Sequence, residues 1–217
     1  MKVKWLGHSS FLITAEDGTK IITDPYTPGM MGLNYESVKD VADIVTVSHE
    51  HGDHNAVGRL PGSPEVVRDT GAKVVKGIEF KGMAAYHDAS RGGQRGANTI
   101  FCFTVDGVRV CHLGDLGHQL TDAEIAEVGQ VDVLLIPVGG NFTIDAAGAT
   151  QVLEKIKPRV VMPMHYRNEK CPQFPVAGVD DFLKGKTNVT RETGSEVEFK
   201  AGQLPATTQI VVLQPAC

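Results

Sequence analysis

Short runs of apolar and β-branched residues, separated by polar turns, fill the first half of the chain. Runs of this kind are typical of β-strands, and turn residues such as Glu16-Asp17-Gly18 separate two of them. The pattern predicts strands at residues 2–6, 10–14, 20–23, 43–47, 65–68, 72–75, 78–80 and 83–86. Residues 26–35 and 90–98 are rich in glycine and show no clear period, so we expect loops there.

The second half of the chain mixes strands with helices. Asp106-Gly107 lies between apolar runs at 101–105 and 108–113, which is the strongest short signal for a β-hairpin. Thr121 and Glu124 have the spacing of a capping box that opens a short helix. The remaining pattern predicts buried strands at 131–138 and 159–164, a helix at 145–156, and further strands at 197–200 and 209–213.

The composition is that of an ordinary globular protein. The chain has 217 residues, of which 41% are hydrophobic and 22% charged, enough for one sizeable core in a single domain over residues 1–217. The formal net charge of -5 provides no basic field to attract nucleic acid or an anionic membrane. Gly7-His8-Ser9-Ser10 interrupts the first apolar run too early for a signal peptide or a membrane span, so we expect a cytoplasmic protein.

The four cysteines form no Cys-x-x-Cys pair, which argues against a thiolate zinc site or a redox motif. A two-residue turn at Asp106-Gly107 would set Cys102 opposite Cys111. In a cytosolic protein we expect these two residues to be reduced thiols packed as small hydrophobic side chains.

The densest chemistry lies in Ser48-His49-Glu50-His51-Gly52-Asp53-His54, directly after the predicted strand at 43–47. Neutral imidazole and carboxylate are the usual protein ligands of zinc and of the harder first-row metals. In an extended backbone His49 and His51 point to one side, and Asp53 and His54 follow where the chain turns. One stretch could therefore serve two metal ions.

Other metal-binding residue types stand at the ends of other predicted strands. His87, Asp115 and His165 each follow an apolar run, as His49 does. Strand ends at one edge of a sheet converge in space, so we expect these four side chains to meet. The sequence thus predicts a metal site of histidines and carboxylates built at the edge of a sheet.

These motifs and their order resemble those of the metallo-β-lactamase superfamily, over residues 3–165. Within it, Gly7-His8-Ser9-Ser10, Thr23-Asp24-Pro25 and His112-Leu113-Gly114-Asp115-Leu116-Gly117-His118 resemble the branch of small metal-dependent hydrolases that includes L-ascorbate-6-phosphate lactonase-like proteins. The resemblance implies an α/β fold, an αββα sandwich of two mixed sheets with helices outside and a metal centre at the edge between the sheets.

The resemblance also implies a ligand set, residue by residue. It gives His49, His51 and His87 to one metal ion, Asp53, His54 and His165 to a second ion, and Asp115 to both as a bridge. Two adjacent cations can activate one water molecule and polarise the bond it attacks. Asp53 is expected to act in addition as general acid and base, and His8 is a further candidate catalytic residue.

Some assignments stay open in the sequence. His87 lies closer to the first motif than in the lactamases themselves, and His112 competes for its role, although we favour a buried, hydrogen-bonded His112. Asp88 could add or replace a ligand. Asp24 is either a plain turn residue or a carboxylate that orients a ligand histidine.

Farther from the motif, five single residues and one glycine pair have both a functional and a structural interpretation. His118 could face the pocket, Met30 and Met31 could line its entrance, and Gly139-Gly140 permits close backbone approach to a ligand. Arg91 and Arg95 could hold a phosphate or a carboxylate, although a solvated loop charge is favoured.

We interpret the sequence as a hydrolase that cleaves an ester-type bond: a phosphodiester, a lactone or a related ester. A flavodiiron-type redox protein typically has a glutamate where this chain has His51, and a ribonuclease of the tRNA-processing kind would need a basic arm. A non-catalytic metal- or ligand-binding protein is a further alternative.

The expected cofactors are two divalent metal ions, zinc in the first place, with manganese, iron or nickel compatible with the same ligands. The expected partner is a small-molecule substrate, with no nucleic acid and no membrane. Self-association into a homo-oligomer is left open by the sequence.

Overall fold

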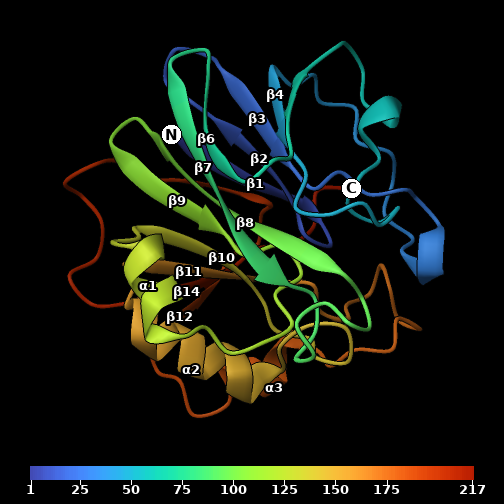
Figure 1. Ribbon diagram of the computed structural model, residues 1–217, viewed down its shortest axis with the longest axis vertical. Coiled ribbons are helices and arrows are strands. Elements are labelled where there is room, and N and C mark those ends of the chain that lie inside the picture. Colours follow the sequence, from blue (N-terminus) through green and yellow to red (C-terminus); the bar gives the residue numbers. More distant parts are fainter.

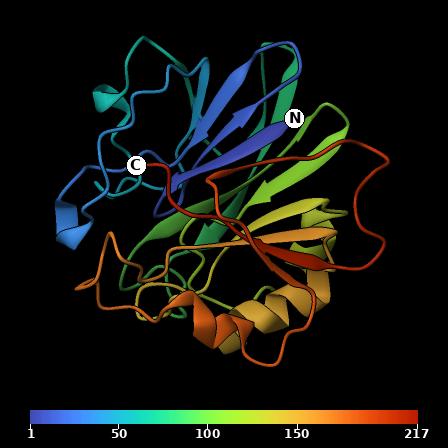
Figure 2. The ribbon, with the colours of Figure 1, turned by 180° about the vertical axis from the view of Figure 1, so that it is seen from behind.

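Two β-sheets lie face to face in the computed structural model, which describes all residues 1–217 (Figures 1 and 2). The smaller sheet has six strands, in the spatial order β13 (Glu196–Glu198), β1 (Lys2–Gly7), β2 (Ser10–Thr14), β3 (Lys20–Thr23), β4 (Ile44–Thr46) and β5 (Glu65–Val67). Pairing is antiparallel from β13 to β3 and parallel from β3 to β5, so this sheet is mixed.

The larger sheet has eight strands and is mixed as well. Their spatial order is β12 (Val189–Arg191), β14 (Gln209–Val212), β11 (Val160–Met164), β10 (Val133–Pro137), β9 (Val108–His112), β8 (Ala97–Val105), β7 (Ile78–Tyr86) and β6 (Gly71–Val75). The antiparallel meander from β6 to β9 continues into parallel strands from β9 to β12. Parallel strands need crossover connections, and helices supply two of these.

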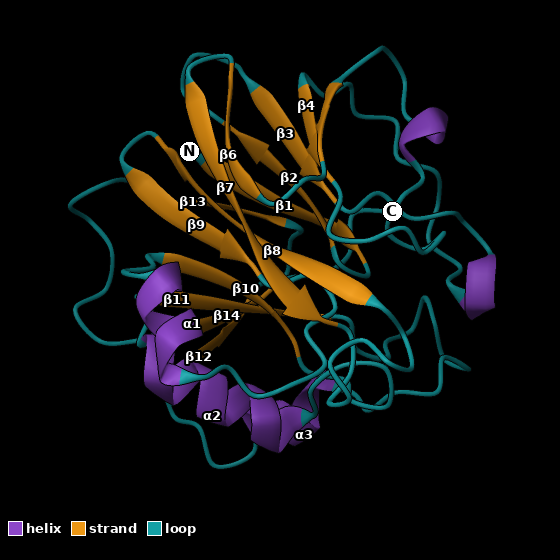
Figure 3. Ribbon diagram, in the orientation of Figure 1, coloured by secondary structure: helices purple, strands orange, loops and turns teal.

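The α-helices gather along the outer side of the larger sheet (Figure 3). They are α1 (Asp122–Val128), α2 (Ala146–Ile156) and α3 (Val179–Leu183), and two short 3-10 helices, η1 (Met30–Gly32) and η2 (Val57–Arg59), lie elsewhere. α1 begins with the predicted capping box of Thr121 and Glu124. Asp145 is the N-cap of α2, and its side chain accepts from Gly148 N–H. The helix buries Ala149 and Val152 against the core.

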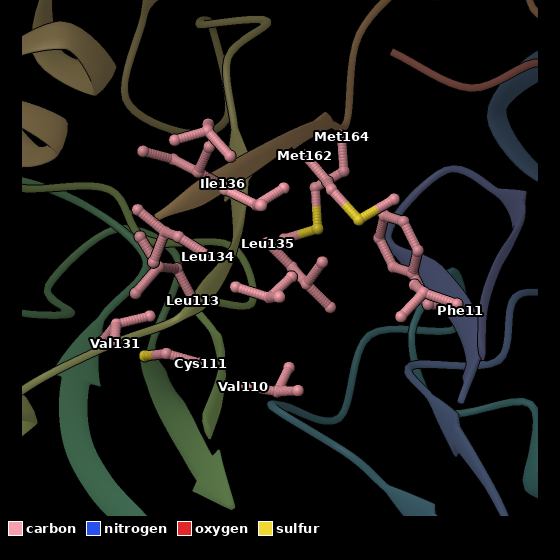
Figure 4. Packing of buried hydrophobic residues seen from close by; sticks show 14 of the residues in the cluster. Phe11, Val110, Cys111, Leu113, Val131, Leu134, Leu135, Ile136, Met162 and Met164 are labelled. Carbon is pink, nitrogen blue, oxygen red and sulfur yellow. The ribbon is translucent and has the colours of Figure 1, made fainter. Parts of the chain in front are cut away.

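The main hydrophobic core lies between the two sheets. Alternate residues of β1 and β2, among them Trp5, Phe11 and Ile13, point into it from the smaller sheet. Figure 4 shows Phe11 pointing toward Met162 and Met164 of β11, across the interface between the sheets. Successive side chains of a strand alternate between its faces, which explains why every second residue of these strands belongs to this core.

A second hydrophobic cluster covers the outer face of the smaller sheet. There the opposite set of strand residues, including Leu12 and Ile22, packs against side chains of the loop segments, including Tyr26, Leu33 and Tyr35. Both faces of the smaller sheet are therefore buried, one against the larger sheet and one against loops.

The predicted α/β fold class with two mixed sheets and outer helices is confirmed. The hairpin at Asp106-Gly107 is confirmed as well, and it pairs Cys102 with Cys111. All four cysteines are free, and the Sγ atoms of Cys102 and Cys111 lie 3.0 Å apart. No helix reaches the length and apolarity needed to cross a lipid bilayer.

Three local predictions were wrong or incomplete. The separate strands predicted at 78–80 and 83–86 are one strand, β7, that runs through Gly82 and pairs with β6 and β8 on its two sides. The loop predicted at 90–98 ends earlier, because Ala97 and Asn98 already belong to β8. α3 and β12 were not predicted.

Gly82 has no side chain, so another segment of backbone can lie directly against β7 without interrupting the strand. A Cβ atom at this position would lie 2.3 Å from the carbonyl oxygen of Asp69 and 3.1 Å from Cα of Thr70. The glycine that suggested a break in the sequence therefore marks a close approach of two backbones.

Gly82→Ala should therefore lower the free energy of unfolding by about 1–3 kcal/mol, the usual range for overpacking. Urea denaturation measures this change. Gly58→Ala is the matched control, because nothing lies within 4 Å of a Cβ atom at that position. Equal stability of the two variants would contradict the proposed backbone contact.

Candidate metal centre

The predicted convergence of strand ends is present in the structure. Segments that follow β4, β7, β9 and β11 carry His49, His87, Asp115 and His165, and all four side chains are buried, with exposed fractions of 1–8%. The first segment comes from the smaller sheet and the other three from the larger sheet. The centre therefore lies where the edges of the two sheets meet.

The Asp115 carboxylate lies among three histidines. Its Oδ2 atom is 3.1 Å from His54 Nε2, 3.2 Å from His87 Nε2 and 3.3 Å from His165 Nε2. Two ligand atoms bound to one zinc ion at about 2.0–2.1 Å in a tetrahedral shell are about 3.3 Å apart. These spacings therefore suit a carboxylate that shares metal ions with the histidines around it.

Potential ligand atoms form three groups, of which one, Asp24 with His49 and His54, shares a histidine with each of the other two. The first of these two contains His49, His51 and His87, and within it the ligand atoms lie no more than 4.8 Å apart. The second group meets the same distance limit and contains His8, Asp53, His54 and His165. Except for His8, these two groups match the division into two metal sites that the sequence predicts. Their role as ligands stays a prediction.

Unpartnered buried atoms provide the test of whether these residues fit a metal ion. His49 Nε2, His54 Nε2 and Asp115 Oδ1 are buried and have no hydrogen-bond partner. The other ring nitrogen of His49 lies 2.9 Å from Ser48 Oγ, and that of His54 lies 2.9 Å from Asp24 Oδ2. A ring whose Nδ1 is held by a protein oxygen presents Nε2 to a metal, so the residues fit a divalent cation.

Asp24 organises the ligands of the smaller sheet. It follows β3, is completely buried, and accepts hydrogen bonds from Ser48 N–H at 2.8 Å and from Ser48 Oγ and His54 Nδ1. Of the two interpretations of Asp24 in the sequence, the contact with His54 supports the orienting carboxylate. That His54 binds a metal ion stays a prediction. Ser48 extends the same network to His49.

Two glycines and an asparagine place Asp115. Asn98 of β8 accepts from Asp115 N–H at 2.9 Å and donates to the carbonyl of Leu113. A Cβ atom at Gly114 would lie 2.6 Å from Ser48 Cβ, and one at Gly117 would lie 2.3 Å from the backbone of His87. The Gly-Asp-Leu-Gly sequence is therefore what lets this loop pack directly against two segments that carry predicted ligands.

The protonation states of His49 and Asp115 suit cation binding. Burial, followed by the neighbouring His54, lowers the pKa of His49 to about 3. Burial alone would raise the pKa of Asp115, but His165 and His54 hold the pKa of this carboxyl well below its usual value. Neutral imidazoles and ionised carboxylates are the forms that bind metals. Burial opposes the charged form of His54, but Asp115 and Asp24 raise its pKa well above the usual value, so this ring must release a proton to bind a metal ion.

His8 completes the second group from the smaller sheet. It follows β1 with a positive φ of 52° and is almost fully buried. Its Nε2 atom lies 3.3 Å from Asp53 Oδ2. Burial and then His165 lower the pKa of His8 to about 4, so the ring is neutral and we assign its Nε2–H as the donor to Asp53. The sequence made His8 a candidate catalytic residue without naming a partner, and the structure places its ring beside Asp53.

His112 is not available as a ligand. It is completely buried, its Nε2 donates to the Ser9 carbonyl at 2.9 Å, and its Nδ1 accepts from Gly114 N–H at 3.2 Å. Both ring nitrogens are used, so the prediction of a buried, hydrogen-bonded histidine is confirmed. The bond to Ser9 also links the two sheets.

Asp88 and His118 have structural roles outside the centre. The Asp88 carboxylate accepts four backbone N–H bonds, from Ser90, Gly92, Gln94 and Arg95, at 2.7–3.1 Å. The idea that Asp88 adds a metal ligand is therefore wrong, because its oxygens are occupied by the loop that follows. His118 accepts from Tyr86 N–H and lies 3.0 Å from the Gln119 carbonyl, so it does not face the metal centre.

Gly139 serves packing rather than ligand binding. A Cβ atom there would lie 2.2 Å from the carbonyl oxygen of His165. This close approach holds the end of β10 against the segment that carries His165. The interpretation of Gly139-Gly140 as a ligand-approach site is therefore replaced by a structural one for Gly139.

A cavity of about 330 Å³ opens above the centre. Its lining combines five groups of the predicted centre with six other residues. The lining residues are Met30, Met31, His51, Gly52, Asp53, His87, Gln94, Arg95, Asp115, Phe142 and His165. Met30 and Met31 line this cavity, which is the functional one of their two interpretations, while Arg91 borders a different cavity.

Sequence reasoning missed three residues of the centre and its cavity. Ser48 and Asn98 act through hydrogen bonds to ligand-bearing segments, and Phe142 forms a wall whose ring lies 6.4 Å from the His165 ring. Ser48 belongs to the motif itself, and Phe142 follows the glycines after a buried strand. Asn98 carried no local signal, because its partner is 17 residues away.

Fold and site together define a class of protein, and comparison with known families agrees with it. Residues 2–165 match the family described as the β-lactamase superfamily domain, and the chain belongs to this superfamily. Among its relatives are proteins named UPF0173 metal-dependent hydrolase. The one from Archaeoglobus fulgidus is 31% identical over 220 residues, covering 85% of this chain and 90% of the relative. The one from Pyrococcus horikoshii is 35% identical over 199 residues, covering 76% of this chain and 84% of the relative.

A solved structure resembles nearly the whole chain. A metallo-β-lactamase superfamily protein from Thermotoga maritima matches with a TM-score of 0.80 and 37% identity, over 98% of this chain and 97% of that one. The predicted superfamily is thereby confirmed. The narrower resemblance to ascorbate-6-phosphate lactonase-like proteins stays a suspicion.

Asp24→Asn should weaken metal binding about 10- to 100-fold, the range found when a partner of a ligand histidine is removed. The amide cannot accept from both Ser48 and His54 as the carboxylate does. Competition with a chelator measures the affinity. Asp122→Asn, at an exposed helix start, is the control, and an unchanged affinity in Asp24→Asn would contradict the orienting role.

His87→Ala should lose bound metal, while His112→Ala should retain a metal content near that of the wild type, because only His87 leaves its Nε2 within reach of Asp115. Elemental analysis of the folded fraction of each variant checks this pair. Loss of metal from His112→Ala alone would reverse the assignment.

Proposed function

We propose that this protein is a metal-dependent hydrolase that directs a water molecule against an ester-type bond, in a phosphodiester, a lactone or a related ester. The observation that carries the proposal is the pair of neighbouring ligand groups joined by Asp115 at the floor of an open cavity. The names of the relatives, metal-dependent hydrolases, support the same activity. The ions are proposed to be two, with zinc first, because histidine and carboxylate ligands suit it.

Divalent ions bound here would lower the pKa of water toward neutrality and polarise the carbonyl or phosphoryl oxygen under attack. Asp115 and the histidines around it would hold these ions. Ser48 holds the ring of His49 in orientation, and Asp24 holds that of His54. Phe142 and the two methionines form the walls beside which a substrate would lie.

Asp53 is proposed to move the proton. Burial raises the pKa of Asp53, but the hydrogen bond from His8 and the neighbouring His54 outweigh it and lower this pKa below its usual value. The carboxylate is therefore ionised, and a proton transferred to it would be held weakly and passed on readily. It borders the cavity and is held by His8 at 3.3 Å. A positioned general acid or base of this kind contributes about 10²- to 10⁴-fold to a rate. His8 is proposed to keep the Asp53 carboxylate in place.

Two alternatives are less well supported. A ribonuclease of the tRNA-processing kind would need a basic surface, whereas the net charge is -5. A non-catalytic metal-binding protein would need a closed coordination shell, whereas the centre borders an open cavity. The proposed partner is accordingly a small molecule.

Turnover should disappear on removal of metal with a chelator and return when zinc or another divalent ion is added. A screen of lactones, phosphodiesters and other esters, repeated with each metal, measures this. Asp53→Ala and His51→Ala should lose at least about 100-fold in kcat, because they remove a proton acceptor and a ligand.

Glu50→Gln is the matched control within the same motif. Glu50 is exposed and pairs with Arg68 and Asn55, so its loss should leave activity unchanged. Full activity in both Asp53→Ala and His51→Ala would contradict the proposal. Metal-loaded protein without turnover of any ester would favour the non-catalytic alternative.

A further inference from the structure

Arg95 is the single arginine or lysine among the residues that line the cavity above the metal centre. Its side chain makes no ion pair and no hydrogen bond to another residue of the chain, whereas Arg68 and Arg191 are both paired with carboxylates. Its guanidinium carbon lies 5.5 Å from the centroid of the Phe142 ring. An unpaired guanidinium beside an aromatic wall of an active-site cavity is a typical recognition group for an oxyanion.

The loop that carries Arg95 is built to fix its position. The four N–H bonds accepted by Asp88 include one from Arg95 itself at 2.7 Å and one from Gln94 at 3.0 Å. His87 N–H donates to the Gly96 carbonyl at 3.1 Å, so the segment returns to the residue from which it departed. The backbone of Arg95 is thus tied directly to the segment that carries a proposed metal ligand.

Phe142 connects Arg95 with the metal centre. Its ring lies 5.5 Å from the Arg95 guanidinium carbon and 6.4 Å from the ring of His165. A substrate whose reacting bond lies over the centre would extend along Phe142 and reach the guanidinium with its far end. Met30 and Met31, which are 40% and 50% exposed, supply further apolar surface along the cavity.

We propose that Arg95 is a specificity-determining residue that binds a carboxylate at the non-reacting end of the substrate, and that the substrate is a short, mostly apolar ester carrying this second acidic group. The inference rests on the proposed hydrolase function. A carboxylate matches one guanidinium in shape and in its single charge, whereas a phosphate monoester carries about 1.5–2 charges near pH 7.

The neighbouring cavity is a poorer place for the same anion. Arg95 also borders it, together with Arg68, but Arg68 is already paired with Glu50 at 2.9 Å. The Glu50 carboxylate would repel a second one there. The free guanidinium therefore serves the cavity that contains Asp115 and Phe142.

Calorimetric titration of the metal-loaded protein with succinate, glutarate and adipate, each against the monocarboxylate of equal chain length, tests the proposal without any turnover. At least one dicarboxylate should bind about 10-fold or more tightly than its monocarboxylate, the usual effect of a charge-assisted hydrogen bond. Arg95→Gln should abolish this gain. Arg91→Gln, in the same loop but at another cavity, should keep it.

The proposal would be overturned if a dicarboxylate gained the same affinity over its monocarboxylate in wild type and in Arg95→Gln. It would also be overturned if no dicarboxylate bound more tightly than its monocarboxylate. Tighter binding of 3-phosphonopropionate than of succinate, lost in Arg95→Gln, would replace the carboxylate by a phosphate-like group and overturn the stated class. Folding of each variant is checked by its metal content, which Arg95→Gln should leave unchanged.

Measurements of activity distinguish a failure of this inference from a failure of the proposed function. The substrates are p-nitrophenyl butyrate, which is neutral, and the mono-p-nitrophenyl esters of succinate and glutarate, which are acidic. Arg95→Gln should raise KM for the acidic esters about 10-fold or more, leave their kcat unchanged, and leave both constants of the neutral ester unchanged. Hydrolysis of no ester at all would contradict the proposed function, while the dicarboxylate titration would still decide the role of Arg95.

Discussion

The structure depends on keeping an ionised carboxylate buried. Asp115 is 2% exposed, and removing an isolated carboxylate from water costs several kcal/mol even after the protein relaxes. Three imidazoles surround its Oδ2 atom, and Asn98 holds its backbone. Every strand that brings one of these partners begins or ends at the same edge of the sandwich. The arrangement of the strands and the burial of this carboxylate therefore depend on each other.

The need to bring these segments close to Asp115 explains the nearby glycines better than a preference for turns does. Gly114, Gly117 and Gly139 each lie where a Cβ atom would come within 2.2–2.6 Å of a segment that carries a ligand or orients one. Larger residues at these places would separate the strand ends and leave the buried charges without partners. The glycine-rich character of the motif around Asp115 is thus a packing requirement of the centre.

Local patterns predicted much of the secondary structure, for identifiable reasons. The hairpin at Asp106-Gly107, the capping box at Thr121 and the helix at 145–156 are determined by residues close in sequence. The pairing of β13 with β1 and the insertion of β14 between β11 and β12 join distant segments, which no local pattern encodes. Gly82 misled the interpretation because its partner, Asp69, lies in another strand connection.

In the candidate centre, too, some residues could be predicted from the sequence and others are identified only by the folded structure. His49 to His54, His87, Asp115 and His165 could be found in the sequence, because metal-binding residue types at strand ends converge. Their supporting residues could not: Asn98 is an ordinary strand residue until its bonds to Leu113 and Asp115 are seen. The occupation of Asp88 by backbone N–H groups likewise appears only when the loop after it is folded.

The candidate centre draws its groups from both sheets, with His8 and the 48–54 segment on one side and three strand ends of the larger sheet on the other. An ion held there would bind the native chain and not the unfolded one, so its binding free energy would add to that of folding. Such coupling makes the lifetime of the polypeptide a function of metal supply. In a metal-starved cell the chain would be degraded sooner, and its abundance would follow the free-ion concentration without any change in transcription.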